Sequence, residues 1–438
     1  MLYNDDDRFA RGTIACAIRN SFVDAQTQLP EELQKYVKCY RLVDMVEFHN
    51  DSFVLSISTT SKSVYVQKSA FHLVRIADYM SLNSISYNPK EQPDKEFAYV
   101  DLSSVDNGHI SFDNTFLGKD APSRARRIAG NRSILISTVR PNLKGFAYLD
   151  KARPNTIYST GFAILNSKNE KELMEKYVYY CFMNSSEIME QLIDKMPKGQ
   201  YPSVNSVELG NIELPLPPIS IQQQIVSECE AEDKVFSENT SLIKAKKEMA
   251  TGIIANVNGA RVSIRDVASF SSDRSSYSDI TEDTYVTTDN MLQNCEGVTE
   301  YNGEPNIETV VAYHKGDILL SNIRPYLKKL WLADRDGGCS PDVLVLHVDR
   351  SKALPEFVYY SLRRDEFFDF IMSDVKGLKM PRGKKETIER FQFMLPNIEE
   401  QQRIVAKVSA LDKEIRQMRT RMQECATNKQ AILDKYLK

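Results

Sequence analysis

Hydrophobic residues recur with a regular spacing between Glu399 and Leu437, where they predict one long helix. The spacing alternates between four and three, which forms the heptad seam of a helix that packs against a partner helix. The apolar seam positions are Ile404, Val408, Leu411, Ile415, Met418, Met422, Cys425 and Ile432. A matching seam lies about 180 residues earlier, at Ile225, Cys229, Phe236, Ile243, Ala250 and Ile253, with the polar residues Glu232, Asn239 and Lys246 among them. The two seams predict an antiparallel pair of long helices; the alternative is two amphipathic helices, each packed on its own domain.

The chain also repeats itself once. Ser133–Lys144 matches Asp317–Lys328, and both segments end in Arg-Pro-x-Leu-Lys. Leu216–Val226 matches Leu395–Val405 in a Leu-Pro-x-Ile-x-x-Gln-Gln pattern. Two shorter matches keep the same order: Tyr177–Tyr180 with Phe357–Tyr360, and Leu73–Ala77 with Ile264–Ala268. Four matches in one order indicate two diverged copies that differ by loop insertions.

Each copy predicts the same order of elements. An alternating apolar stretch and a strand ending in Arg-Pro are followed by a helical stretch, Glu172–Ile193 or Pro355–Met372, and by a short strand closing in proline. Because the residue before a proline prefers extended geometry, Arg140 and Arg324 are expected to be extended, where the strand gives way to a loop. We therefore predict an α+β fold, with two mainly β domains joined by two long antiparallel coiled-coil helices in a pseudo-twofold arrangement.

This reading divides the chain into five parts. We predict an N-terminal extension of unknown role (1–69), a first mainly β domain (70–217), a central helix (218–255), a second mainly β domain (256–396) and a distal helix (397–438). The extension itself predicts a helix from about Asp6 to Ala25, a second helix from Pro30, and extended segments such as Ser52–Ile57.

Composition narrows the class of protein. The formal net charge of −4 excludes a uniformly basic nucleic-acid coat, although it leaves room for a local basic surface. The seven cysteines are scattered and form no Cys-x-x-Cys pair, which argues against a zinc ribbon or a disulfide framework and fits a reducing cytoplasm. The acidic N-terminus does not resemble a signal peptide, and no apolar run approaches the ~20 residues that span a bilayer. We expect a cytoplasmic protein without a bound metal or a membrane partner.

Motifs for catalysis are missing from the sequence. It contains no His-Glu-x-x-His, Gly-x-Ser-x-Gly or Walker A pattern, and neither the glycine-rich cofactor loop nor the Asn-Pro-Pro-Tyr turn of a methyltransferase. Pro341-Asp342 resembles the start of a nuclease motif, but the second acid and the lysine do not follow it. We therefore predict no catalytic residues; an enzyme would need a metal site built from residues distant in sequence.

Basic and amide side chains are concentrated on equivalent loops of the two copies, which suggests contacts with phosphates and base edges of DNA. The candidates in the first copy are Arg124, Arg126, Arg127, Arg140, Asn142, Lys144, Lys198, Gln200, Tyr201 and Asn205. Those in the second copy are Asn322, Arg324, Tyr326, Lys328, Lys329, Lys379, Arg382 and Lys384. The alternative for any one of them is a solvated surface charge, or a structural ion-pair partner.

At this point the sequence resembles a known family. The Leu-Pro-x-Ile-Glu-Glu-Gln-Gln-Arg-Ile-Val pattern at Leu395–Val405, with its variant at Leu216–Val226, is similar to the conserved region of specificity subunits of type I restriction–modification systems. Gly316–Ser321 resembles a strand of their target recognition domains. The first copy departs from the pattern, because Ser220 and Ile221 replace the acidic pair Glu399 and Glu400, and weaker capping of the first helix is expected.

The resemblance implies a non-catalytic subunit that binds double-stranded DNA. Each target recognition domain would bind one half of a split target, and the helix pair would set the gap between the halves. The helices would dock two adenine methyltransferase subunits, which bring S-adenosylmethionine, and restriction/translocase subunits would join that core. Two other readings stay open: the specificity partner of a fused restriction–methyltransferase enzyme that cuts on both sides of its site, and a coiled-coil scaffold without a DNA function.

Overall fold

The computed structural model describes residues 16, 19–20, 46–49, 54–57, 69–196, 202–303, 308–375 and 380–438. The chain divides into two compact units, Met1–Lys68 and Ser69–Lys438. In the first unit, strands β1 (Val46–His49) and β2 (Val54–Ile57) form an antiparallel hairpin, in agreement with the extended segment expected there. The two helices expected in this unit lie outside the described residues, apart from Cys16, Arg19 and Asn20, which are helical.

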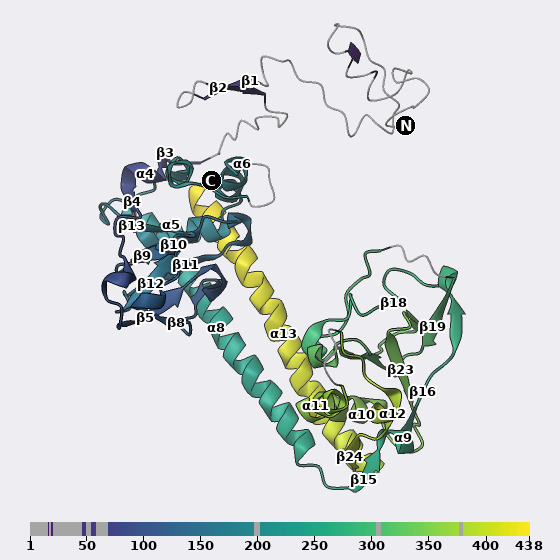
Figure 1. The fold of residues 1–438 in the computed structure, drawn as a ribbon. Helices are drawn as coiled ribbons and strands as arrows, with labels where there is room; N and C mark the ends of the chain where they lie inside the picture. The colour runs from purple at the N-terminus through teal and green to yellow at the C-terminus, as the bar shows by residue number, and fades with distance from the viewer. Residues whose placement is uncertain are drawn as a thin grey trace. The chain divides into compact units, whose positions relative to one another are not determined.

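Two four-stranded sheets form the first mainly β domain of the second unit (Figure 1). One has the order β11-β10-β13-β4, and its strands are β4 (Met80–Leu82), β10 (Ser133–Ser137), β11 (Phe146–Leu149) and β13 (Phe162–Ser167). The other has the order β8-β5-β12-β9, with β5 (Glu96–Val100), β8 (Thr115–Leu117), β9 (Ala125–Arg127) and β12 (Thr156–Ser159). A small hairpin, β6 (Val105–Asp106) and β7 (His109–Ile110), lies between β5 and β8 in sequence. All five residues of β10 are buried, as expected of a central strand covered on both faces.

The second domain repeats this topology. Its first sheet has the order β16-β23-β20-β21, formed by β16 (Ala268–Phe270), β20 (Ile318–Ser321), β21 (Leu330–Leu332) and β23 (Val343–Val348). Its second sheet has the order β17-β19-β22-β18, formed by β17 (Arg274–Ser276), β18 (Tyr285–Val286), β19 (Thr309–Tyr313) and β22 (Gly337–Cys339). The two second sheets share three strands, β5-β12-β9 and β18-β22-β19, each with one parallel pair. Their fourth strands lie at opposite edges, because β8 pairs with β5 whereas β17 pairs with β19, the counterpart of β9. The predicted repeat is therefore a repeat of fold.

Each domain is closed by pairing of its outermost strands. In the first domain β3 (Leu73–Arg75) pairs antiparallel with β14 (Glu213–Pro215), and in the second β15 (Ala260–Ser263) pairs with β24 (Gln392–Leu395). The chain consequently enters and leaves each domain at neighbouring points. A domain built in this way is a module that sequence exchange can replace as a unit.

Short helices complete the domains. The helical stretch expected over 172–193 is two helices, α5 (Glu175–Asn184) and α6 (Ser186–Asp194), and its counterpart is α10 (Pro355–Leu362) followed by α11 (Asp365–Ser373). The first stretch is divided because Ser185 is extended and its hydroxyl accepts a hydrogen bond from the Ile188 N–H, which starts a new helix. The remaining helices are α4 (Ile76–Tyr79), α7 (Ser206–Gly210), α9 (Ile264–Val267) and α12 (Lys385–Glu389).

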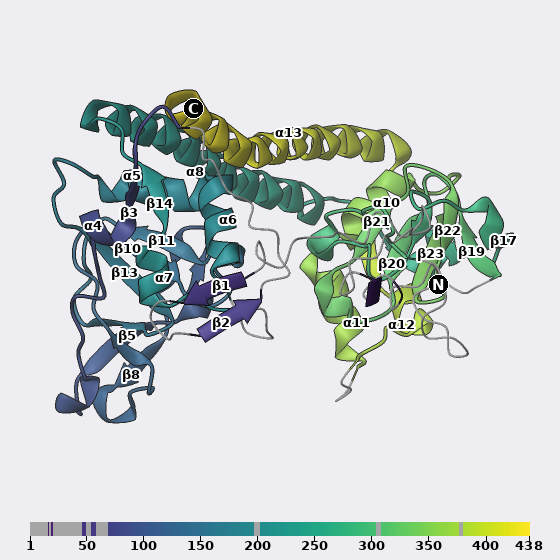
Figure 2. The same ribbon diagram turned by 90° about the horizontal axis from the view of Figure 1, so that it is seen from above.

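Two long helices, α8 (Ile219–Ala255) and α13 (Ile398–Leu437), lie side by side and run antiparallel (Figures 1 and 2). Every predicted seam residue on both helices is buried or partly buried, including the polar Glu232, Asn239 and Lys246. Two of the polar seam residues have partners across the pair: Lys246 pairs with Glu414, and Glu232 with Arg421 and Asn428. These pairs set the register of the two helices, which is the usual role of polar residues on a seam.

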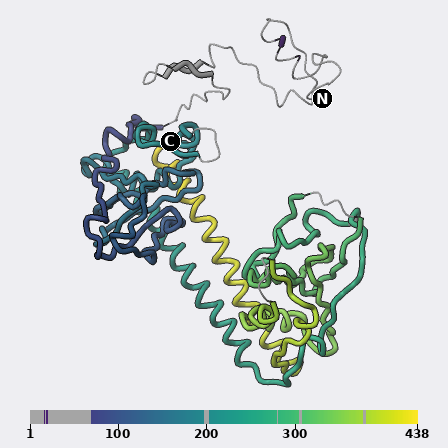
Figure 3. Tube along the Cα trace, viewed as in Figure 1, coloured from purple at the N-terminus to yellow at the C-terminus, as the bar shows by residue number. Residues whose placement is uncertain are grey.

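Each long helix begins in one domain and ends in the other. Ile225, Val226 and Cys229 of α8 belong to the core of the first domain, and so do Leu433 and Leu437 at the far end of α13. In the core of the second domain the two helices exchange these roles: Ile404 and Val408 come from the start of α13, and Ala250 and Ile254 come from the end of α8. The tube in Figure 3 follows this path, with the end of α13 reaching the domain that contains the start of α8. This exchange produces the predicted pseudo-twofold arrangement.

Equivalent aspartates fasten the domains to the helices. The Tyr180 hydroxyl donates to Asp233 Oδ2 at 2.6 Å, and Arg363 donates two hydrogen bonds to Asp412, at 2.8 and 3.0 Å. Burial lowers the pKa of Arg363, but the Asp412 carboxylate outweighs it and holds that pKa above its ordinary value. Both contacts join the helix that follows the sheets to the long helix of the same copy.

The Gln-Gln pattern of the repeat has a structural explanation. Gln222 and Gln401 are fully buried, and the side-chain oxygen of each accepts a hydrogen bond from the residue before α5 or α10, at Met174 N (2.9 Å) or Leu354 N (2.8 Å). Their amides donate to carbonyls just before the long helices, Pro217 O and Pro396 O. Each glutamine therefore fixes the start of a long helix to its own domain.

The expected difference in capping is confirmed. At α13, Asn397 caps the helix by accepting from the Glu400 N–H at 2.9 Å, and Glu399 and Glu400 are in the first turn. At α8, Pro218 is the N-cap, with neither a side-chain cap nor an acidic residue in the first turn.

Replacing Gln401 by alanine is expected to lower the stability of the second domain by about 2–3 kcal/mol, because Leu354 N and Pro396 O lose their partners. Thermal unfolding measures the change. Gln402 is exposed on the same turn, so Gln402→Ala is a matched control that should cost less than about 0.5 kcal/mol. Equal effects of the two substitutions would contradict the role given to Gln401.

Candidate nucleic-acid interface

The repeated Arg-Pro-x-Leu-Lys segments, Arg140–Lys144 and Arg324–Lys328, form the same tight turn, here called the Arg-Pro turn. Each contains one turn of 3-10 helix that begins at a buried proline, Pro141 or Pro325. The backbone is left-handed at both ends of each turn, with φ of 47° at Arg140, 52° at Arg324 and 52° at both lysines. The extended conformation expected of the two arginines is therefore wrong.

A second loop explains this conformation; it is here called the partner loop and comprises Pro202–Val204 in the first domain and Pro381–Gly383 in the second. The Arg140 N–H donates to Pro202 O at 2.8 Å, and the Arg324 N–H donates to Pro381 O at the same distance. Val204 N bonds Thr138 O at 2.9 Å, and Gly383 N bonds Asn322 O at 3.0 Å. These tertiary hydrogen bonds override the local preference of a residue before proline.

The structure thus brings together the two candidate loops of each copy, which are about 60 residues apart in sequence. Val139 forms a β-bridge with Ser203, and Ile323 forms one with Arg382. The candidates Lys198, Gln200, Tyr201 and Lys379, at the start of these second loops, lie outside the described residues.

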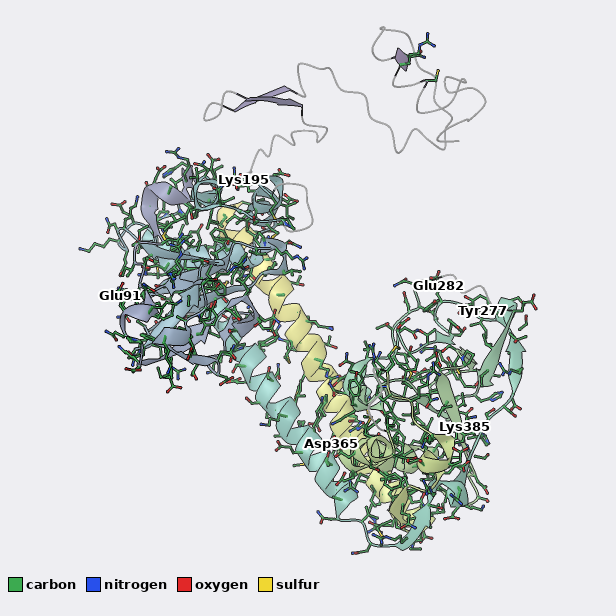
Figure 4. All side chains as sticks on the ribbon, in the orientation of Figure 1. Glu91, Lys195, Tyr277, Glu282, Asp365 and Lys385 are labelled. Carbon is green, nitrogen blue, oxygen red and sulfur yellow. The ribbon has the colours of Figure 1, made fainter. Side chains whose placement is uncertain are left out.

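The lysine that ends each turn serves as an anchor. Lys144 Nζ donates to Met183 O at 2.8 Å, and Lys328 Nζ forms an ion pair with Asp365 Oδ1 at 2.7 Å. Met183 is near the end of α5, and Asp365 (labelled in Figure 4) is the first residue of α11. Both ammonium groups therefore fasten the turn to the following helices, which favours the structural alternative for these two candidates.

Several other candidates also have partners within the protein. Arg382 pairs with Asp342 at 2.7 Å, Lys384 with Asp374 at 3.2 Å, and Lys329 Nζ donates to Thr288 O. Asn205 caps α7 by accepting from the N–H groups of Val207 and Glu208, both at 2.9 Å. Arg126 donates to the neighbouring Ala125 O. Arg127 and Asn322 are partly buried, and Arg127 Nε and Asn322 Oδ1 have no partner among the described residues.

The remaining candidates are exposed: Arg124, Arg140, Asn142, Arg324 and Tyr326. Four of these five belong to the two Arg-Pro turns, and half of the surface of Tyr326 is accessible. The turns therefore present an exposed arginine and one exposed polar or aromatic residue on a backbone that is held from several sides. This combination suits contacts with phosphates and base edges.

Residues between Asn294 and Gly297 were not predicted, although they support the turn of the second domain. Cys295 N donates to Lys328 O at 2.8 Å, and its thiol donates to the same oxygen at 3.3 Å. Burial raises the pKa of Cys295 to about 12, so this thiol keeps its proton. The next residue, Glu296, pairs with Lys247 of α8 at 2.8 Å and with Arg419 of α13. The sequence carries no signal for this link, because Cys295 and Glu296 belong to none of the repeated motifs.

The described residues contain no group of three or more histidine, cysteine, aspartate or glutamate side chains able to hold a metal ion. In the same part of the chain, no helix is both long and apolar enough to cross a bilayer.

Known proteins share the sequence pattern and the fold of this chain. The family described as "Type I restriction modification DNA specificity domain" matches residues 123–247 and 261–424, together more than half of the chain. The type I restriction enzyme EcoDI specificity subunit of Escherichia coli is 28% identical over 99 residues, a match that spans 23% of this chain and only 22% of that relative.

Two solved structures share the fold. One is a chain described under "Structural basis underlying complex assembly and conformational transition of the type I R-M system"; it is 22% identical, with a TM-score of 0.51 over 84% of this chain and 97% of that one. The other is the type I restriction–modification S subunit from M. genitalium, which is 14% identical, with a TM-score of 0.52 over 85% of this chain and 97% of that one. Since one family matches both copies of the repeat, the chain belongs to the type I restriction–modification DNA specificity family.

Proposed function

We propose that this chain is the non-catalytic subunit that selects the DNA sequence in a type I restriction–modification complex, with each mainly β domain binding one half of a split target. The observation that carries this proposal is the repetition of the Arg-Pro turn and its partner loop in both domains, on the same backbone. Two equivalent surfaces joined through an antiparallel helix pair are what recognition of two separate half-sites requires.

The proposed partners are two adenine methyltransferase subunits, which supply S-adenosylmethionine, and restriction/translocase subunits that join them. The helix pair is the proposed dock for the methyltransferases. It is long, and α8 exposes large apolar side chains that no domain covers, with 47% of Leu242 and 59% of Met249 accessible. A fused restriction–methyltransferase partner would use the same helix surface, so the two arrangements differ in the partner and not in this chain.

The proposal is tested with the methyltransferase encoded beside this chain, in a host without adenine methylation. Methylome sequencing should find one split adenine-methylated motif when both proteins are expressed, and none when either is expressed alone. The purified chain mixed with S-adenosylmethionine and DNA should transfer no methyl groups. Methyl transfer by the purified chain alone would contradict the proposal, and the size of the partner separates the fused from the unfused arrangement.

A further inference from the structure

We propose that the third residue of each Arg-Pro turn, Asn142 in the first domain and Tyr326 in the second, is a specificity-determining residue that contacts the bases of the half-site bound by its own domain. This inference rests on the proposed function. It goes beyond it by assigning the difference between the two half-sites to one structurally equivalent position.

The two turns have nearly the same backbone. The first residue has φ and ψ of 47° and 54° at Arg140, against 52° and 62° at Arg324. The last residue has 52° and 38° at Lys144, against 52° and 48° at Lys328. The same hydrogen bonds close both turns, from the fourth residue to the carbonyl of the first and from the fifth to that of the second. The third side chain is therefore presented from an equivalent position in both domains.

The positions of the turn that are identical in the two copies hold this backbone. The N–H of the arginine bonds the partner loop, the proline is buried, and the lysine is anchored to the following helices. The third position has no such contact, since the side chains of Asn142 and Tyr326 are exposed and form no hydrogen bond with any described residue. It is also the position at which the two Arg-Pro-x-Leu-Lys segments differ. The backbone of the turn is thus the same in both domains, and the exposed residue at its third position differs.

The two residue types read bases differently. The carboxamide of Asn142 offers one donor and one acceptor side by side, which matches the N6 and N7 atoms of adenine in the major groove. Tyr326 lacks this pair of groups; its ring packs on bases or on a thymine methyl group, and its hydroxyl forms a single hydrogen bond. The two half-sites should therefore depend on this position through different contacts, hydrogen bonding in the first and mainly apolar contact in the second.

The test compares the methylomes produced by the full chain with its methyltransferase, for Asn142→Ala, Tyr326→Ala and Tyr326→Asn. Each variant should still methylate the split motif but relax or change one base position in its own half, so that sites with that mismatch gain roughly 10-fold or more in methylation. The other half should keep its sequence. Asn114 is another exposed asparagine of the first domain, and it belongs to neither the Arg-Pro turn nor its partner loop. Asn114→Ala is therefore the matched control and should leave both halves unchanged.

Two results would overturn the inference. One is an unchanged motif for both alanine variants. The other is an equal loss of methylation across both halves together with a lowered unfolding temperature of Tyr326→Ala, because Tyr326 would then support the fold. A wild-type chain that directs no split motif would instead count against the proposed function, which keeps the two failures distinguishable.

Discussion

Reversing the charge of Arg324 is expected to weaken binding of the complete DNA target by roughly 10- to 100-fold, with the loss confined to the second half-site. Arg324 is exposed at the start of the Arg-Pro turn, and no described residue forms an ion pair or hydrogen bond with its guanidinium group. A glutamate there removes one phosphate contact and adds repulsion. Binding of a duplex target to the assembled methyltransferase complex, measured at several salt concentrations, gives the affinity and its salt dependence.

The control for Arg324→Glu is Arg265→Glu. Arg265 is an exposed arginine on α9 of the same domain, and it belongs to neither the Arg-Pro turn nor its partner loop. It undergoes the same change of charge, so a general electrostatic effect would weaken both variants equally. Arg324→Glu should also reduce the slope of log affinity against log salt by about one. Equal affinities for Arg324→Glu and the wild type would remove the turn from the DNA interface.

Placing a charge at Leu433 is expected to lower the stability of the first domain by more than Gln401→Ala lowers that of the second domain. Leu433 is 2% exposed, and it packs from α13 into the core of the first domain. Leu433→Asp buries a carboxylate without a partner and removes apolar contacts, at a cost of about 3–5 kcal/mol. The unfolding temperature should fall by roughly 6 °C or more.

Ala431 provides the control for this substitution. It is exposed two residues earlier on the same helix, so Ala431→Asp should change the unfolding temperature little. Limited proteolysis adds a second readout, because α13 of Leu433→Asp should become cleavable near its end while the second domain stays intact. Similar behaviour of the two variants would contradict the exchange of helix ends between the domains.

The helix pair and the repeat were predictable because each is visible as a pattern of residues in the sequence itself. The heptad spacing of residues such as Ile404, Val408 and Ile415 predicts that one face of the helix is buried, and this prediction does not depend on which partner covers that face. The missing acidic pair at Ser220 and Ile221 likewise predicted the absent cap of α8, since capping is decided within one turn of helix.

Features decided by distant contacts were not predictable. The left-handed backbone at Arg140 depends on a hydrogen bond to Pro202, and the break before α6 depends on a cap at Ser185 that competes with helix continuation. The two Arg-Pro turns lie on equivalent loops as expected, but Arg126 and Arg127 belong to strand β9 and not to a loop. Composition alone also did not separate anchors such as Lys328 from the exposed Arg324. That distinction requires the position of Asp365, which lies 37 residues away in sequence.

In the proposed function, each domain independently selects one half of a split DNA target. The pairing of β15 with β24 brings the two ends of the second domain together, so residues 256–396 can be exchanged for the matching segment of a related chain. Methylome sequencing of a host that expresses this hybrid with the methyltransferase is the decisive measurement. The hybrid should direct a motif in which one half is new and the other is unchanged. If a folded hybrid changes both halves, or neither, the domains do not select their half-sites independently.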